Sequence, residues 1–368
     1  MRVLIAPDKF KGSLSAQEVC THLAAGIRNR CPHADILVSP LADGGEGSLD
    51  TVENALTNIK RRYVHTVNAA GDPLTTYYLY AGNQAWIEMA KASGWASLAP
   101  YQRLPMNLST FGTGVLVADA IAEGFTEITI FCGGSATVDG GLGLAMAVGY
   151  QFRDDEGTLQ KAQASSLDKI NQLAKPKRLE LKGIRFFMAV DVFNPLTGPH
   201  GAAVVYGPQK GANPEQCLQL DLGLQHLRRV WDKYLGQDPG DVPGAGAAGG
   251  LGAAGIAFLG ANIVSGAQYL ISLCSLEEKI QSADLVVTGE GKLDHQSLAG
   301  KLVWQIYQLT TASNKPLIIV CGTNTVQEVS LQASVMSLTG MGYSSEQAIR
   351  HAPQLIYAIG QNIGAGLA

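Results

Sequence analysis

Six short segments of the chain are rich in glycine, and nearly all of them also hold a carboxylate or a lysine. They are Pro40–Gly47, Gly133–Gly141, Asp191–Gly198, Gly207–Gly211, Pro243–Gly250 and Gly289–Asp294. Glycine lets backbone N–H groups approach and bind an anion, while lysine neutralises phosphate and carboxylates bind divalent metal ions. These are the groups that phosphoryl transfer requires. The pattern therefore predicts a kinase that acts on a small molecule.

The segment 133–141 follows an apolar run and precedes a predicted helix through 145–148. Its backbone amides and the hydroxyls of Ser135 and Thr137 are expected at the helix N-terminus, where anions bind. The alternative is a capped helix that begins after a wide turn. The segment 109–114, ahead of a predicted helix 115–123, is a weaker version of the same pattern.

Acidic residues follow three of the predicted strands. Asp43 and Glu46 come after a strand at 36–41, Asp191 ends a strand at 186–190, and Glu290 follows a strand at 284–288. In open α/β sheets, ligands bind outside the carboxyl ends of the strands. Each acid has an ordinary alternative, because Asp-Gly forms turns and a lone Asp often caps a strand end. For Asp191, the Pro195–Gly198 turn beside Asn194 favours a rigidly positioned base.

Lysines accompany several of these segments. Lys292 and Asp294 lie in 289–294, which is predicted to open a helix at 298–311. Lys11 lies between the first strand and the first helix, and Lys210 lies among glycines. Each could neutralise a phosphate or a carboxylate, or could be an exposed charge without a ligand.

The segment 244–249 satisfies the spacing GxGxxG, which is typical of dinucleotide-binding folds. The context is wrong, because polar residues and prolines precede it and no acid follows about twenty residues later. The segment is therefore predicted to form a phosphate cradle or a close helix contact. A Walker A loop, GxxxxGK[ST], is also missing.

Composition excludes several classes of protein. The chain has 368 residues, of which 16% are charged, and its formal net charge is −4. No basic stripe occurs, which argues against nucleic-acid and anionic-membrane partners. The six cysteines form no CxxC pair, and the N-terminus lacks the features of a signal peptide, so we expect a cytoplasmic protein. The uncharged stretch 251–273 is interpreted as a buried helix pair rather than a membrane span.

The elements that position these segments alternate between strand and helix. Strands are predicted at 3–6, 36–41, 284–288, 316–321 and 334–338, with a helix after a capping box at Ser15 and Glu18. In the middle region, 77–80 and 85–89 are predicted to form a hairpin, and 128–131, 186–190 and 202–206 further strands. We expect two α/β domains, one with a mostly parallel sheet and discontinuous in sequence, the other inserted with a mixed sheet. The predicted domains are 1–72 with 283–368, and 73–282, although 110–150 fits either.

Seven stretches together resemble the type I glycerate kinases, or glycerate 2-kinases. They are 5–16, 40–48, 133–141, 191–198, 207–212, 243–252 and 288–301. The resemblance implies a flavodoxin-like discontinuous domain and Mg²⁺- and ATP-dependent phosphorylation of D-glycerate to 2-phosphoglycerate. Lys9 stands where relatives commonly have Ser, and Ser48 where they have Thr. Neither change removes a charge that the chemistry needs.

Roles for the residues follow from the chemistry. Asp191 is expected to accept the hydroxyl proton, with Asp294 as second choice, while Asp43 and Glu290 hold Mg²⁺. Lys292 and Lys11 are expected to neutralise phosphate or the glycerate carboxylate, and Asn194 and Lys210 to contact the substrate or an anion. The amides and hydroxyls expected along the phosphates belong to Gly133, Gly134, Ser135, Thr137, Gly246, Gly249 and Gly250.

Several alternatives stay open. They are a kinase that forms 3-phosphoglycerate or acts on a related hydroxy acid, a nicotinamide-dependent dehydrogenase, a Mg²⁺-dependent phosphatase and a non-catalytic binding protein. The sequence does not decide between a monomer and a dimer.

Overall fold

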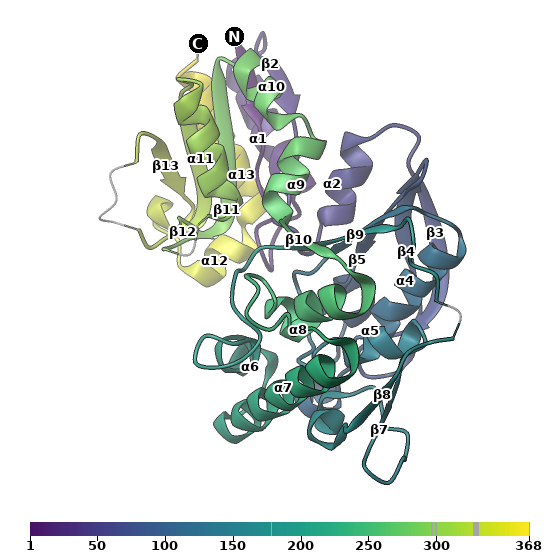
Figure 1. Cartoon of the computed structure of the whole chain (residues 1–368). Helices are drawn as coiled ribbons and strands as arrows, with labels where there is room; N and C mark the ends of the chain where they lie inside the picture. The colour runs from purple at the N-terminus through teal and green to yellow at the C-terminus, as the bar shows by residue number, and fades with distance from the viewer. Residues whose placement is uncertain (178, 296, 299, 327–330, 368) are drawn as a thin grey trace. The chain divides into compact units, whose positions relative to one another are not determined.

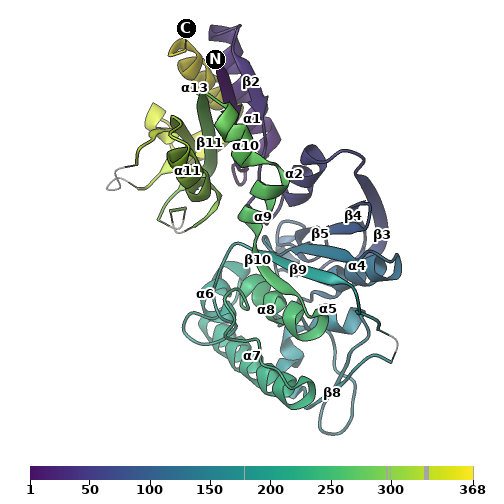
Figure 2. The same ribbon diagram turned by 45° about the horizontal axis from the view of Figure 1, so that its top comes forward.

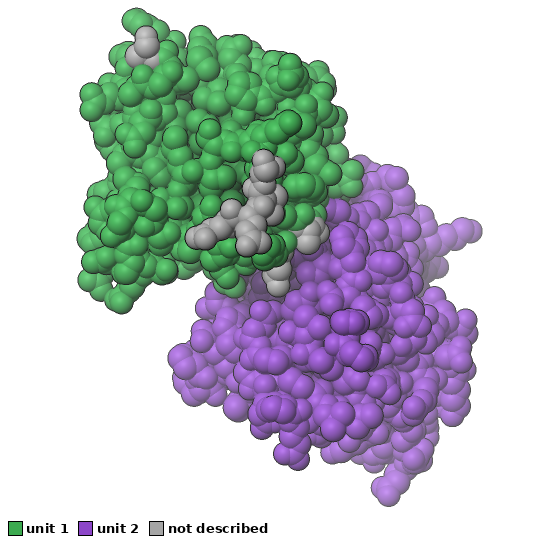
Figure 3. Space-filling view, turned by 90° about the vertical axis from the view of Figure 1, so that its left-hand side faces the viewer, with its two compact units in different colours: residues 1–43, 50–57, 267–368 green, residues 44–49, 58–266 purple. Residues whose placement is uncertain are grey.

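A computed structural model describes the whole chain except residues 178, 296, 299, 327–330 and 368. Its contacts divide the chain into two compact units (Figure 3). The first unit holds residues 1–43, 50–57 and 267–368, and the second holds 44–49 and 58–266. Each unit is described by itself.

The first unit is built on a five-stranded parallel sheet with the order β13-β12-β11-β1-β2. The strands are β1 (Arg2–Ile5), β2 (Asp35–Val38), β11 (Leu285–Leu293), β12 (Leu317–Asn324) and β13 (Ser334–Ser337). The helices are α1 (Ala16–Arg30), α9 (Gly266–Leu273), α10 (Leu276–Ser282), α11 (Leu302–Ala312), α12 (Ser345–Arg350) and α13 (Ala352–Ala365). The predicted mostly parallel sheet, assembled from both ends of the chain, is confirmed.

Both faces of this sheet are covered, as a parallel sheet requires (Figure 1). Val3 and Ile5 of β1 point into the core shared with α1 and α13, whereas Leu4 belongs to the core shared with α10 and α11. Helix α1 begins at the predicted capping box, in which the Ser15 hydroxyl accepts from the Glu18 N–H and the Glu18 carboxylate accepts from the Ser15 N–H.

The second unit contains a six-stranded mixed sheet with the order β10-β9-β6-β5-β4-β3. The strands are β3 (Lys60–Val67), β4 (Pro73–Ala81), β5 (Gln84–Glu88), β6 (Glu127–Phe131), β9 (Arg185–Val190) and β10 (Asn262–Ser265). Strands β3, β4 and β5 are antiparallel, and the pairs from β5 to β10 are parallel. The predicted hairpin is therefore confirmed as β4–β5, and so is the mixed sheet.

Helices of the second unit pack mainly on one face of its sheet (Figure 2). They are α4 (Phe111–Ala122), α5 (Leu142–Ala147) and α8 (Ala247–Ala254), with the long α7 (Pro214–Leu235) beyond them. The shorter elements are α2 (Ser48–Ala55), whose later residues belong to the first unit, α3 (Ala90–Ser93), α6 (Ala202–Tyr206), β7 (Gln151–Arg153) and β8 (Gln172–Ala174).

Three predictions about elements were wrong. The segment 202–206 is the helix α6, because it lies on α7 and α8 with Ala202 and Ala203 buried and Val204 and Val205 exposed, which is no strand alternation. The uncharged stretch 251–273 is not a helix pair: Gly260, at φ 65°, ends the π-helical turn Gly255–Leu259, and β10 then pairs with β9. Residues 289–293 do not open a helix, because β11 continues to Leu293 beside β12 and α11 starts only at Leu302.

Two further points concern the chain as a whole. Among the described residues, no helix is both long and apolar enough to cross a membrane. The compact units meet at 43/44, 49/50, 57/58 and 266/267, whereas the domain boundaries were predicted at 72/73 and 282/283. Contacts place β3 with the second unit and α9 and α10 with the first; the division into domains stays a prediction.

Candidate active site

In the first unit, three carboxylates lie at the carboxyl ends of neighbouring parallel strands. Asp8 follows β1 and donates its N–H to the carbonyl of Gly289 (2.8 Å), Asp43 follows β2, and Glu290 lies on β11. This is the edge of an open α/β sheet where ligands bind. Asp43 and Glu290 were predicted for this edge, while Asp8 was missed although it lies only two residues after the first predicted strand.

Two of these carboxylates, Asp8 and Glu290, have raised pKa values. Burial, followed by the negative charge of Asp43, raises the pKa of Asp8 well above its usual value. Burial also raises the pKa of Glu290 to about 7, with smaller contributions from the charges of Asp294 and Asp43. Oε1 of Glu290 is buried and accepts no hydrogen bond from the described residues. A cation bound here would relieve both the repulsion and the unpaired oxygen.

Asp8, Asp43 and Glu290 fit a Mg²⁺ site in part. Carboxylate oxygens are its preferred protein ligands, and Mg²⁺ usually takes one or two of them together with water and substrate phosphates. Among the described residues, however, no three His, Cys, Asp or Glu side chains already form a group able to hold a metal ion.

Lys292 and Asp294 lie at the end of β11. Their side chains form an ion pair with 3.4 Å between Nζ and Oδ2, and Lys292 is 61% exposed. The N–H of Ser297 donates to Oδ1 of Asp294 (3.2 Å), so Asp294 also closes a turn. Gly291 allows the loop of Lys11 to approach, since a Cβ at Gly291 would lie 3.0 Å from the backbone nitrogen of Lys11. The Lys11 side chain is exposed.

In the second unit, Lys210 is buried beneath the segment 133–141. Its Nζ donates to the hydroxyl of Ser135 (2.7 Å) and to the carbonyl of Thr137 (2.8 Å), and only 5% of the residue is exposed. Burial lowers the pKa of Lys210 to about 7, although the charge of Asp139 acts in the opposite direction. The predicted lysine and the predicted hydroxyl segment are thus brought together.

Asp139 occupies the helix N-terminus at which the sequence analysis predicted a bound anion. The buried carboxylate accepts from Thr110 through its N–H (2.7 Å) and hydroxyl (2.8 Å), and from the N–H groups of Gly141 (3.2 Å) and Gly143 (3.1 Å). Asp139 therefore fixes the start of α5. The Ser135 hydroxyl faces Lys210 instead, while the buried Thr137 hydroxyl has no partner among the described residues.

The segment 44–49 lies against Gly133 and Gly134. The N–H of Gly133 donates to the carbonyl of Gly44 (3.0 Å), so this amide is already used within the protein. Gly134 has φ 75°, and a Cβ there would lie 2.9 Å from Cγ of Glu46. The buried Glu88, at the end of β5, accepts from the N–H groups of Gly47 (3.2 Å) and Leu49 (3.1 Å). The sequence reasoning missed Glu88, which lies within an apolar strand without any motif.

The segment 243–250 packs against two other glycine-rich segments. A Cβ at Gly246 would lie 2.2 Å from the carbonyl oxygen of Pro195, and one at Gly249 would lie 2.0 Å from that of Thr137. Ala248, Gly249 and Gly250 all have positive φ, at 53°, 69° and 97°. The GxGxxG spacing therefore serves close backbone packing, as one of the two predictions for it had stated. No residue from 236 to 246 is in a strand, unlike in a dinucleotide fold.

Asp191 directly follows β9, at the carboxyl edge of the second sheet. Its charge contributes, after burial, to a raised pKa of the Cys132 thiol and to a pKa of about 12 for Tyr206. The Tyr206 hydroxyl donates to Oδ1 of Asn194 (2.7 Å), whose Nδ2 donates to the carbonyl of His200 (2.8 Å). Asn194 thus holds the segment 191–198 in shape.

The whole chain matches one family of proteins. The model of the glycerate kinase family matches residues 3–368. This chain belongs to the glycerate kinase family. The family resemblance seen in the sequence is therefore confirmed.

Relatives within the glycerate kinase family align over nearly their full length. The glycerate 2-kinase of Escherichia coli strain K12 is 38% identical, with 100% of this chain and 98% of the relative covered. The glycerate kinase of Halalkalibacterium halodurans is 36% identical over 98% of this chain and 97% of its own. A crystal structure of a Salmonella typhimurium LT2 protein assigned to glycerate kinase 2 superposes with a TM-score of 0.81 at 36% identity, covering 100% of this chain and 98% of the other.

Membership of the glycerate kinase family bears on the alternatives. The dehydrogenase reading has no support, because the family is one of kinases and the GxGxxG segment lacks the required strand. A non-catalytic role is likewise unsupported.

Proposed function

We propose that this protein transfers the γ-phosphoryl group of ATP to the 2-hydroxyl of D-glycerate, forming 2-phosphoglycerate and ADP. The observation that carries the proposal is the full-length relationship to the E. coli protein named glycerate 2-kinase. The acids around Glu290 and the segment 133–141 with Lys210 also supply groups suited to phosphoryl transfer.

In the second unit, Asp191 is proposed as the base that accepts the proton of the attacking hydroxyl. It lies at a strand end, on a segment whose shape Asn194 and Tyr206 hold through hydrogen bonds. A base must be positioned before its pKa matters, and this segment meets that requirement. Asp294 is the second choice, but its side chain already pairs with Lys292 and closes a turn.

The phosphates and the glycerate carboxylate need positive charge and amide donors. Lys11 and Lys292 have exposed side chains able to supply charge in the first unit. In the second unit, Lys210 lies beneath Gly134, Ser135 and Thr137, so its ammonium strengthens an anion site on that segment without touching solvent. Gly246, Gly249 and Gly250 are proposed to border the same site. Gly133 contributes less directly, because its N–H is bonded to Gly44.

Asp43 and Glu290 are proposed to hold Mg²⁺, with Asp8 beside them. When bound, the ion would neutralise charge on the transferred phosphate. Asp8, Asp43 and Glu290 themselves repel each other, which favours a cation between them. We further propose a cytoplasmic protein, in agreement with cysteines that are all unpaired.

Phosphorus NMR tests the proposal and its regiochemistry together. Purified protein with ATP, Mg²⁺ and D-glycerate should give a growing 2-phosphoglycerate signal as ADP forms. A 3-phosphoglycerate signal would keep the kinase and reject the position. Inorganic phosphate released without ADP would indicate a phosphatase, and no turnover would reject the proposal.

A further inference from the structure

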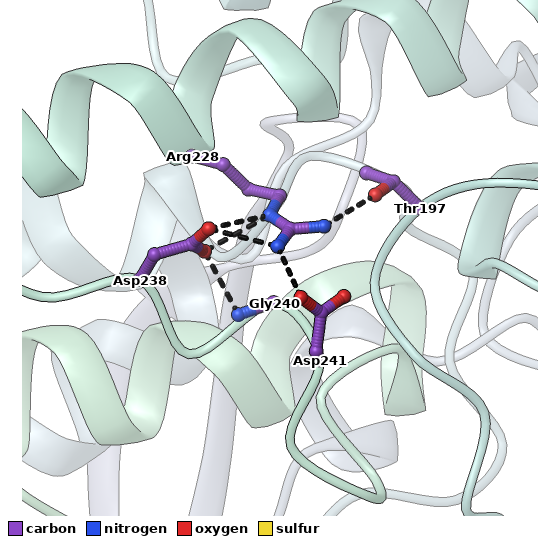
Figure 4. A network of polar contacts seen from close by, with 5 residues as sticks. All are labelled: Thr197, Arg228, Asp238, Gly240 and Asp241. Atoms are coloured by element: carbon purple, nitrogen blue, oxygen red, sulfur yellow. Dashed lines mark hydrogen bonds and ion pairs between the residues drawn. The ribbon is translucent and has the colours of Figure 1, made fainter.

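Arg228, on α7, lies at the centre of a polar network that the sequence reasoning did not notice (Figure 4). Its guanidinium donates to Asp238 through Nε (2.9 Å) and Nη2 (2.8 Å), to Asp241 through Nη2 (2.7 Å) and to the hydroxyl of Thr197 through Nη1 (2.9 Å). We call Thr197, Arg228, Asp238, Gly240 and Asp241 the Arg228 network.

The Arg228 network is built for this one arginine. A Cβ at Gly240 would lie 2.3 Å from Nε of Arg228, so a side chain there would push the guanidinium out of its present position. The N–H of Gly240 also donates to Oδ1 of Asp238 (3.0 Å). Hydrogen bonds from Arg228 and Gly240 outweigh the effect of partial burial and lower the pKa of Asp238. The flat, forked guanidinium spreads its donors over three separate partners in a fixed geometry, whereas an ammonium presents all its donors from a single nitrogen.

The partners of Arg228 lie on two segments of the proposed site. Thr197 belongs to 191–198, which carries Asp191, and Asp238 and Asp241 precede the glycine-rich 243–250. Two backbone bonds join the segments, from the N–H of Leu196 to the carbonyl of Gly240 (2.8 Å) and from the N–H of Gly246 to that of Asn194 (2.9 Å). A second acid on α7, Asp221, accepts from the N–H of Gly198 (2.9 Å).

We propose that Arg228 is a positioning residue for phosphoryl transfer, which sets the place of the Asp191 segment by tying it and the 238–241 turn to α7. The inference rests on the proposed role of Asp191. We assign Arg228 no contact with the reacting atoms, because four of its five N–H donors are already used by Thr197, Asp238 and Asp241. A displacement of about 1 Å at a catalytic group can cost roughly 10²-fold in rate.

The test compares Arg228→Lys with a matched control, Arg62→Lys. Arg62 likewise joins two acids in the second unit, Asp119 (2.6 Å) and Glu123 (2.7 Å), but it lies between β3 and α4. Arg228→Lys should lower kcat roughly 10- to 100-fold, whereas Arg62→Lys should leave it within about twofold. The KM values should change little in both variants.

A double-mutant cycle separates positioning from general structural damage. If Arg228 acts through Asp191, Arg228→Lys should lower kcat hardly any further in a protein that already carries Asp191→Asn. An undiminished loss in that background, or a normal kcat in Arg228→Lys alone, would overturn the proposal.

Hydrogen exchange provides a readout that does not depend on activity. In Arg228→Lys the amides of Leu196 and Gly246 should exchange at least 10-fold faster, while that of Cys132, bonded to Ala189 in the sheet, stays unchanged. Unchanged exchange at Leu196 and Gly246 would overturn the inference. If the wild-type protein fails to phosphorylate glycerate, the proposed function is rejected, and the exchange result still decides whether Arg228 holds the two segments.

Discussion

The Nζ of Lys210 lies 2.7 Å from the hydroxyl oxygen of Ser135, in a position where almost none of the lysine reaches solvent. A buried ammonium is costly unless it is hydrogen-bonded, and here the segment 133–141 provides both acceptors. The segment and the lysine therefore depend on each other: the lysine needs its oxygens, and the segment takes its shape around the lysine.

Replacing Lys210 should change how the free energy of unfolding depends on pH. The pKa of Lys210 is lowered to about 7 from 10.5, so between these values the unfolded chain binds a proton that the folded protein lacks. Stability should therefore rise with pH across this window, by at most about 1.4 kcal/mol per pH unit. The rise should be missing in Lys210→Met. Urea denaturation of both proteins from pH 6.5 to 9.5 measures the difference, and parallel curves would refute a lowered pKa.

Asp191→Asn should lower kcat by at least about 10²-fold while the fold and the KM values are retained. The amide keeps the size of the carboxylate but cannot accept the hydroxyl proton. Steady-state kinetics and thermal melting check this, with Asp232→Asn on the exposed side of α7 as control. A near-normal kcat in Asp191→Asn would remove Asp191 from the base role and direct attention to Asp294.

Glu290 should make the protein less stable as the pH rises from about 4.5 to 7. Its pKa is raised to about 7 from 4.5, mainly by burial, so in this window the folded protein holds a proton that the unfolded chain has lost. Glu290→Gln should show a smaller decline, and the raised pKa of Asp8 accounts for part of what remains. At pH 8, Mg²⁺ should raise the melting temperature of the wild-type protein and have less effect on Glu290→Gln; an equal rise in both would exclude Glu290 as a ligand.

Two glycines with nearly the same backbone conformation should respond differently to alanine. Gly249 (φ 69°) and Gly236 (φ 72°) share the left-handed region, which costs alanine about 1–2 kcal/mol. At Gly236 nothing lies within 4 Å of the new Cβ, whereas at Gly249 the carbonyl oxygen of Thr137 would be 2.0 Å away. Gly249→Ala should therefore cost at least twice as much free energy of unfolding as Gly236→Ala, and it should also lower kcat. Similar losses in chemical denaturation would contradict the packing role.

Local patterns predicted those parts of the fold that depend on neighbouring residues. The capping box at Ser15, the β4–β5 hairpin and the apolar strands β1, β6 and β9 were all found from short-range signals. The helix α6 and the strand β10 were missed for the opposite reason. Ala202–Tyr206 and Asn262–Ser265 are too short for periodicity to decide, and their state is set by packing on α7 and α8 and by pairing with β9.

The candidate site, too, was predicted only in part. Residue types and glycine spacing, read over seven stretches, were enough to indicate the family, which the family match confirms. The roles of the single residues stay predictions, because a charged or glycine residue can also serve a turn or close packing. The tertiary structure alone decided that Lys210 supports Ser135, that Asp139 closes the start of α5 and that Arg228 holds Thr197. Side chains such as Glu88 and Arg228 belong to no local pattern, since their partners are brought to them only when distant segments pack.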